Sequence, residues 1–333
     1  MTDRVLVSAA LFDLLATHGV RPDAVGLASD GARQRISTEQ FFALWRAVED
    51  RARDDRSVGL TIGAHAVDHA SSVAMTAALH AASLGEALVT LGRYKRLVCP
   101  EQLLITRERG EASVRFHWVL AGSEVPRLLV DSTFAGVLTM ARRGTGTALT
   151  PRRIELARRA SDRALLSSFF GCEVRFGAAF DRMVLDERAL GLPFVTHDAS
   201  ALEAMVPGLE AALVDRQAGR SFGDDVRVAI AHHLGGDRPT VARVARRLHV
   251  SARTLQRRLE EEHTSYQEQL TDVRRRTARR LLTHTSLDPV EVAFVLGFEE
   301  PNSFIRAFRE WEGTTPGRWR ARREAPQVVA RAM

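Results

Sequence analysis

The hydrophobic positions in the last hundred residues repeat, and the repeat predicts two copies of one helical unit. Residues 244–250, VARRLHV, recur 48 residues later as residues 292–298, VAFVLGF. Each copy follows a helix-start signal and precedes a second stretch with helical periodicity. The C-terminal part of the chain is therefore predicted to contain two helix-turn-helix units.

Small polar residues mark where the helices of these units begin. Thr240 can cap a helix through residue 247, and Ser251 can cap a second helix that starts at Ala252. In the second copy, the motif DPVE at 288–291 supplies an N-cap acceptor, a proline at the first helical position and a glutamate for a capping box. Gly297 then provides a residue that suits a tight turn.

The second helix of the first unit has an apolar side and a side that carries base-reading chemistry. Leu255 and Leu259 lie four residues apart and predict its buried face. The residues left on the outer face are Arg253, Gln256, Arg257 and Glu260. Arginine can make two hydrogen bonds to guanine and glutamine two to adenine, so this face suits the major groove of DNA.

The second helix of the second unit follows the same plan. Phe304, Phe308 and Trp311 predict its buried face, and Asn302, Ile305, Arg306 and Arg309 its exposed face. Asparagine can read adenine, Ile305 can contact a thymine methyl group, and the arginines can hold phosphates.

A longer helix is predicted between the two units. Ser265 and Glu268 form a capping box before an apolar stripe that continues to about His284. Such a helix would fix the two recognition helices relative to each other, and a separation of about 34 Å would match successive major grooves. The five arginines at 274, 275, 276, 279 and 280 spread around it, so a few are expected on phosphate and most in solvent.

The first two hundred residues mix helical and strand patterns. Capping boxes at Ser37 and Ser83 open amphipathic helices. Strands are predicted at 103–106, 113–120, 153–156 and 172–176, and a helical segment at 199–214 is expected to be interrupted near Pro207. The predicted class is α+β, with a mixed α/β sensing and dimerisation domain followed by an all-α domain with two helix-turn-helix units joined by a linker helix. The predicted bounds are 1–215 for the first domain, 216–224 for a linker, 225–325 for the DNA-binding domain and 326–333 for a disordered tail.

Charge and composition agree with a soluble DNA-binding protein. Residues 225–325 hold 19 arginines against 14 acidic residues, whereas residues 1–224 are balanced, so the basic surplus lies where the recognition helices are predicted. The apolar stretch at 5–20 contains Asp13 and His18 and is interpreted as an amphipathic helix rather than a secretion signal or membrane span. A cytoplasmic location is expected. Cys99 and Cys172 are interpreted as free thiols.

Residues 241–320 resemble the DNA-binding domain of AraC-type transcription regulators. The resemblance rests on VSARTLQRRL at 250–259, VRRRTARRLL at 273–282, EVAFVLGFEEPNSFIRAF at 291–308 and GTTP at 313–316. It implies base contacts by Arg253, Gln256, Arg257, Pro301, Asn302 and Ile305, and a backbone contact by Arg306. His263 stands where the family usually has glycine, so it is expected to need a left-handed backbone.

Residues 1 to about 210 are similar, more diffusely, to the sensing domain of the AraC-type subgroup of ornithine-use and virulence regulators. The features are GLTIG at 59–63, SLGEAL at 83–88, CEVRF at 172–176 and LGLP at 190–193. The resemblance implies a homodimer that responds to an unidentified small-molecule effector, binds promoter DNA, and acts with RNA polymerase, as an activator.

Catalytic and metal-binding patterns are scarce in the first two hundred residues, and no enzyme activity, cofactor or metal is assigned. His65, Asp68 and His69 are interpreted as surface residues of a helix. Arg93, Tyr94, His117 and Trp118 are candidate effector ligands because they are polar or aromatic groups on or beside predicted elements. Two alternatives stay open: a DNA-repair alkyltransferase-type regulator with a reactive cysteine, and an architectural protein that bends DNA without sequence preference.

Overall fold

The computed structural model describes residues 5–7, 9–17, 19, 34–52, 55–68, 72–118, 121, 123–217, 221–234, 238–285 and 287–324. The chain divides into two compact units. The N-terminal unit comprises Met1–Leu156, Ala160–Arg175 and Phe180–Arg220, and the C-terminal unit comprises Ser221–Met333 together with the short segments Ala157–Arg159 and Phe176–Ala179. The tail at 326–333, and residues 218–220 of the predicted linker, lie outside the described residues. The domain boundaries stay predictions.

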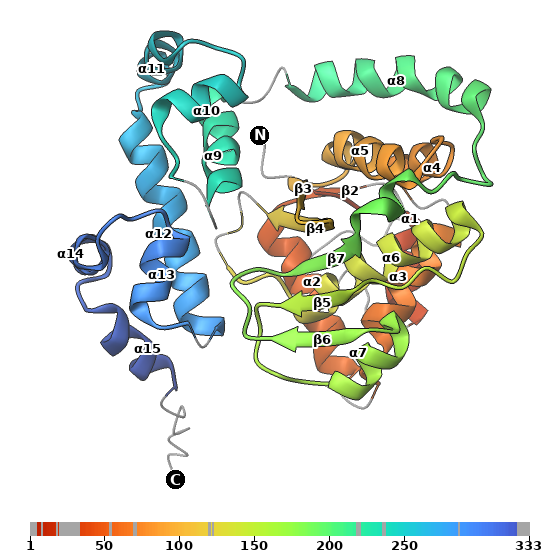
Figure 1. Ribbon diagram of the computed structural model, residues 1–333, viewed down its shortest axis with the longest axis horizontal. Coiled ribbons are helices and arrows are strands. Elements are labelled where there is room, and N and C mark those ends of the chain that lie inside the picture. The colour runs from red at the N-terminus through yellow and green to blue at the C-terminus, as the bar shows by residue number, and fades with distance from the viewer. Residues whose placement is uncertain are drawn as a thin grey trace. The chain divides into compact units, whose positions relative to one another are not determined.

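The N-terminal unit combines helices with a central sheet (Figure 1). Its helices are α1 (Ala9–Thr17), α2 (Thr38–Arg51), α3 (Val58–Asp68), α4 (Val73–Leu79), α5 (Leu84–Tyr94), α6 (Arg127–Thr145), α7 (Arg163–Phe170) and α8 (Ala199–Gln217), with 3-10 turns η2 (Lys95–Leu97) and η3 (Glu187–Gly191). Its strands are β1 (Val5–Val7), β2 (Gln34–Ile36), β3 (Glu101–Glu108), β4 (Glu111–Trp118), β5 (Arg153–Leu156), β6 (Glu173–Phe176) and β7 (Arg182–Asp186).

The larger sheet has the strand order β3-β4-β7-β5-β6, and β1 pairs with β2 apart from it. β3 runs antiparallel to β4, and β7 runs antiparallel to both β4 and β5. Arg109 and Gly110, with φ of 50° and 75°, form the two-residue turn between β3 and β4. The predicted strands are confirmed within a few residues at each end, except that Leu120 lies outside the described residues.

Glycines let α3 and α6 pack at very short range. A Cβ atom on Gly63 would lie 2.1 Å from the backbone oxygen of Ser132, and one on Gly59 would lie 2.7 Å from that of Leu128. Only glycine allows backbones to approach this closely. These two glycines are the first and last residues of the GLTIG motif, so the motif serves helix packing.

Helix α8 corrects one expectation. It runs from Ala199 to Gln217 without a break and contains Pro207, so the predicted interruption is wrong. Proline removes the hydrogen bond to the carbonyl of residue 203. Both Pro207 and Glu203 are exposed, so water can satisfy that carbonyl and the helix continues.

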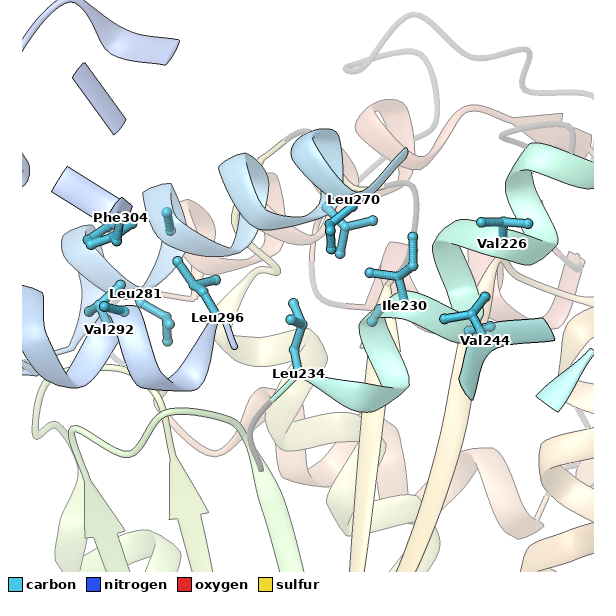
Figure 2. Packing of buried hydrophobic residues seen from close by; sticks show 14 of the residues in the cluster. Val226, Ile230, Leu234, Val244, Leu270, Leu281, Val292, Leu296 and Phe304 are labelled. Carbon is cyan, nitrogen blue, oxygen red and sulfur yellow. The ribbon is translucent and has the colours of Figure 1, made fainter. Parts of the chain in front are cut away.

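From Ser221 onward, the regular secondary structure of the described residues is entirely helical. It consists of α9 (Phe222–His233), α10 (Val241–Arg247), α11 (Ala252–Glu261), α12 (Tyr266–His284), α13 (Pro289–Val295), α14 (Pro301–Glu312) and α15 (Pro316–Glu324). One buried apolar cluster runs through it, and Figure 2 shows Ile230 of α9, Leu270 and Leu281 of α12, and Phe304 of α14 as parts of it. Both helix-turn-helix units therefore share a single core, and the predicted α+β class is confirmed.

Within the part of the chain that the structure describes, none of the helices combines the length and the apolar character needed to cross a membrane.

Candidate nucleic-acid interface

The first helix-turn-helix unit consists of α10 and α11. The Thr240 hydroxyl caps α10 by accepting a hydrogen bond from the backbone N–H three residues later, at 3.3 Å, and Ser251 does the same for α11 at 3.0 Å. Both predicted caps are thus confirmed. The turn between the helices passes through His249, whose φ of 55° lies in the left-handed region. His263, in the turn after α11, also has a φ of 55°. This left-handed backbone was expected because the resembling family usually has glycine at this position.

The second unit consists of α13 and α14. The Asp288 carboxylate accepts from the backbone N–H of Glu291 at 2.8 Å, and the Glu291 carboxylate accepts from that of Asp288 at 2.7 Å. This is the predicted capping box. Gly297 in the turn has a φ of 71°, and Pro301 is the first residue of α14.

Helix α12 lies between the two units and is bonded to the second one. Arg274 of α12 donates to the backbone oxygens of Leu296 at 2.9 Å and Gly297 at 2.7 Å, and its guanidinium carbon lies 4.0 Å from the ring centroid of Phe298. Burial lowers the pKa of Arg274 to about 10. Arg274 satisfies carbonyl groups at the end of α13, a structural role that the arginine pattern did not reveal.

A carboxylate on α14 completes this attachment. The side chain of Glu312 is only 8% exposed. Its carboxylate accepts hydrogen bonds from Nε of Arg275 at 2.7 Å and from Nε and Nη2 of Arg279, both at 2.8 Å. Burial would raise the pKa of Glu312, but the hydrogen bonds from Arg279 and Arg275 outweigh it and hold the pKa below its ordinary value. The orientation of α14 is therefore fixed against α12.

The outer face of α11 presents the predicted base-reading groups. Leu255 and Leu259 are fully buried, as expected. Arg253 and Gln256 are exposed, and neither side chain has a hydrogen bond or ion pair within the described residues. Arg257 is exposed and forms an ion pair with Glu261 at 2.7 Å.

Helix α14 carries the second group of predicted DNA-contacting residues. Phe304 and Phe308 are fully buried. Asn302 is exposed without a side-chain partner in the described part of the chain, while Pro301 and Ile305 are half-buried. Arg306 is exposed and donates to the Ser303 hydroxyl at 3.5 Å. In Figure 1 both α11 and α14 are seen nearly along their axes, with α12 between them.

The structure adds a basic cavity that the sequence analysis did not identify. It lies at α10 and the end of α9, has a volume of about 460 Å³, and is lined by Arg243, Arg246, Arg247, His249 and His233. Its lining residues include no acidic side chain. Burial lowers the pKa of Arg247, which indicates partial desolvation of its guanidinium. Three arginines within five consecutive residues of a short helix, at 243, 246 and 247, were the available signal.

The four candidate effector ligands do not share one place in the N-terminal unit. Arg93 and Tyr94, at the end of α5, both donate to the Glu210 carboxylate of α8 at 2.7 Å. Trp118 lies in the core, 5.8 Å from the ring of Phe41 between centroids. His117 is half-buried in β4.

The thiols and histidines occupy unremarkable surroundings. Cys99 is buried, and burial raises the pKa of the half-buried Cys172 thiol. The ring of His65 bonds the backbone oxygen of Thr61 at 3.0 Å, and His69 lies outside the described residues. Among the described residues, no group of three or more His, Cys, Asp and Glu side chains could hold a metal ion.

Comparisons with known proteins agree with this arrangement. A family model for the N-terminal arabinose-binding domain of AraC transcription regulators matches residues 11–194, and a helix-turn-helix domain model matches residues 244–322. The ornithine utilization regulator of Pseudomonas aeruginosa is 28% identical over 331 residues, which cover 97% of this chain and 96% of the relative.

Two further proteins are also similar. The transcriptional regulator VirS of Mycobacterium tuberculosis is 28% identical over 249 residues, which cover 73% of this chain and 72% of VirS. The crystal structure of the transcriptional regulator CdpR from Pseudomonas aeruginosa has a TM-score of 0.45 and 24% identity, and the match covers 93% of this chain and 98% of that chain. Because the first family model spans more than half of the residues, the chain is a DNA-binding transcription regulator that belongs to the AraC family.

Proposed function

We propose that this regulator reads two adjacent half-sites of a promoter, one with α11 and the other with α14. Arg253, Gln256 and Arg257 are the proposed base contacts of α11, and Pro301, Asn302 and Ile305 those of α14, with Arg306 on the DNA backbone. The observation that carries the proposal is that Arg253, Gln256 and Asn302 are exposed and have no side-chain partner in the described part of the chain. Polar groups that are held on a rigid helix and left unsatisfied are suited to bond base edges.

The basic cavity at α10 is proposed to contact phosphates beside the first half-site. In a helix-turn-helix, the first helix crosses the DNA backbone while the second enters the groove. Arg246 and Arg247 lie on that first helix, in a cavity without acidic lining residues. Their contribution would be independent of sequence and sensitive to salt.

The N-terminal unit is proposed to act as a homodimeric sensing domain for a small-molecule effector, in a cytoplasmic protein that activates transcription together with RNA polymerase. Support comes from the arabinose-binding family model and from the full-length similarity to an ornithine utilization regulator. A dimer would present four recognition helices.

The two alternatives have less support. Alkyl transfer needs an activated thiolate, whereas Cys99 is buried and burial raises the pKa of the Cys172 thiol. An architectural role predicts binding by charge and DNA shape alone, which would leave the polar groups on α11 and α14 without a function.

The test is selection of binding sites by the full chain from a library of random 40-base-pair duplexes at about 150 mM salt, where nonspecific phosphate binding is weakened. The proposal predicts an enriched motif with two half-sites about 10 base pairs apart, centre to centre. Recovery of sequences without a shared motif, in the presence and absence of cell extract as a source of effector, would contradict it.

A further inference from the structure

The N-terminal unit contains a second cavity, remote from the four residues predicted as effector ligands. It has a volume of about 850 Å³ and opens between the first turns of α5, the turn between β3 and β4, and η3. Its lining includes Ser83, Glu86, Val89, Arg107, Glu187 and Leu190. Arg93, Tyr94, His117 and Trp118 do not line it.

The backbone around this cavity is held in place by direct bonds. The N–H of Leu84, at the start of α5, donates to the oxygen of Leu192 at 3.0 Å, and the N–H of Glu187 donates to the oxygen of Gly110 at 3.0 Å. At Gly85 the helix approaches η3 so closely that a Cβ atom would lie 2.9 Å from the oxygen of Leu190. The walls are thus fixed to one another, as expected for a preformed ligand site.

Some charged groups at the cavity are paired with one another. Asp186 accepts from Arg152 at 2.6 Å and from Arg188 at 3.1 Å. Hydrogen bonds from Arg188 and Arg152 hold the pKa of Asp186 well below its usual range. These three lining residues are engaged with one another, and two guanidiniums share one carboxylate, so the group has a formal charge of +1.

Other charged groups at the cavity have no such partner. Arg107 and Glu187 line it, and neither side chain forms a hydrogen bond or ion pair within the described residues. The side chain of the exposed Glu86 has a single partner among the described residues, the backbone N–H of Ala82 at 3.3 Å. Beside the Arg152–Asp186–Arg188 cluster, the cavity therefore offers one further guanidinium and two further carboxylates.

An apolar surface accompanies these charges. Val89 is 63% exposed, and it lines the cavity with Leu190 and the methyl-bearing Thr90. A ligand with a short hydrocarbon chain would bury this surface.

We infer that this cavity is the effector site and that it binds a small zwitterion of the α-amino-acid class, with its carboxylate on Arg107 and its ammonium group on Glu187 and Glu86. A guanidinium is the preferred protein partner of a carboxylate, and a carboxylate that of an ammonium group. The inference rests on the proposed function, because it names the ligand of the proposed sensing unit.

The cavity is connected to the last helix of the N-terminal unit through α5. The first turns of α5 line the cavity, and its last residues, Arg93 and Tyr94, bond Glu210 of α8 at 2.7 Å. Helix α8 is the last element of the N-terminal unit before the residues that lead to α9. Helix α5 therefore connects the cavity directly to the α8 attachment.

The experiment measures the thermal transition of the full chain with each of the twenty protein amino acids, and with shorter homologues of lysine, at 10 mM. At least one should raise Tm by several degrees, and its Kd is then measured by calorimetry. The methyl ester and the N-acetyl derivative of that amino acid should bind at least tenfold more weakly, because each lacks one of the two charges. Failure of every amino acid to raise Tm, or equal binding of the derivatives, would overturn the inference.

Matched variants locate the site. Arg107→Gln and Glu187→Gln should each raise Kd at least tenfold, whereas Arg109→Gln and Glu108→Gln, which alter exposed charges outside the cavity, should leave Kd within twofold. Unchanged binding by both cavity variants would overturn the inference. DNA-site selection without added ligand reports on the proposed function separately, so a failure of one proposal is distinguishable from a failure of the other.

Discussion

His249 and Gly297 occupy the same position in the two helix-turn-helix units, and both have a left-handed backbone, with φ of 55° and 71°. Glycine adopts this conformation freely, whereas a residue with a Cβ atom pays about 1 kcal/mol. We expect His249→Gly to raise the free energy of unfolding by about 1 kcal/mol, and Gly297→Ala to lower it by a similar amount. Urea unfolding followed by tryptophan fluorescence measures both changes. A loss of stability in His249→Gly would show that its side chain contributes more than the strain costs.

The close contact between α3 and α6 makes Gly63 intolerant of substitution. Gly63→Ala would place a Cβ atom 2.1 Å from a backbone oxygen, so one helix must move, and we expect a loss of at least about 3 kcal/mol. Gly208→Ala is the matched control, because a Cβ atom there meets nothing within 4 Å and alanine favours the helix by about 1 kcal/mol. Thermal unfolding compares the two variants. Similar Tm values for them would contradict the tight packing.

The attachment of α14 to α12 should be sensitive to acid. Because the pKa of Glu312 is lowered in the folded chain, its contribution to stability is present above the ordinary carboxyl pKa of 4.5 and is lost as the pH falls through the lowered value. Glu312→Gln should cost about 1 kcal/mol at pH 7, since both arginine partners are partly exposed, and this cost should shrink toward pH 3.

Glu310→Gln is the control for this measurement, because Glu310 is exposed on the same helix. Urea unfolding from pH 7 to pH 3 gives the difference between the two variants. A difference that does not change with pH would exclude the ionised Glu312 as its source.

Local signals predicted the helix-turn-helix units well. The caps at Thr240, Ser251 and Asp288 depend on residues within four positions of each other, so the sequence contains all the information that they need. The expectation at Pro207 failed because the carbonyl that proline leaves without its helical hydrogen bond lies on an exposed turn, where water can bond it, and exposure cannot be read from one residue.

Contacts between distant residues could not be predicted in the same way. The bonds from Arg274 to the end of α13 join residues 22 and 23 positions apart, and periodicity alone placed the arginines of α12 mostly in solvent. The ion pair between Arg93 and Glu210 joins residues 117 positions apart. The sequence therefore identified polar residues as candidates, but only the folded structure shows which residues they bond.

The basic cavity at α10 should act on DNA through charge alone. Arg246→Gln should weaken binding by a similar factor on all sequences and reduce the slope of log K against log salt concentration by about 0.9. Arg109→Gln, which removes a 91% exposed cation from the N-terminal unit, should leave the slope unchanged. Fluorescence anisotropy between 50 and 300 mM salt measures both variants. A change of base preference in Arg246→Gln would place this side chain in a groove instead.

The most direct test of the central claim combines protein and base substitutions at the selected site. Kd is measured at about 150 mM salt for the full chain, Arg253→Ala and Asn302→Ala, each with the selected duplex and with duplexes changed at one base pair. Each variant should lose about 1 to 3 kcal/mol on the selected duplex and become indifferent to one base pair, in a different half-site for each variant. Equal losses on every duplex, with the base preferences of the full chain retained, would contradict the claim that α11 and α14 read the sequence.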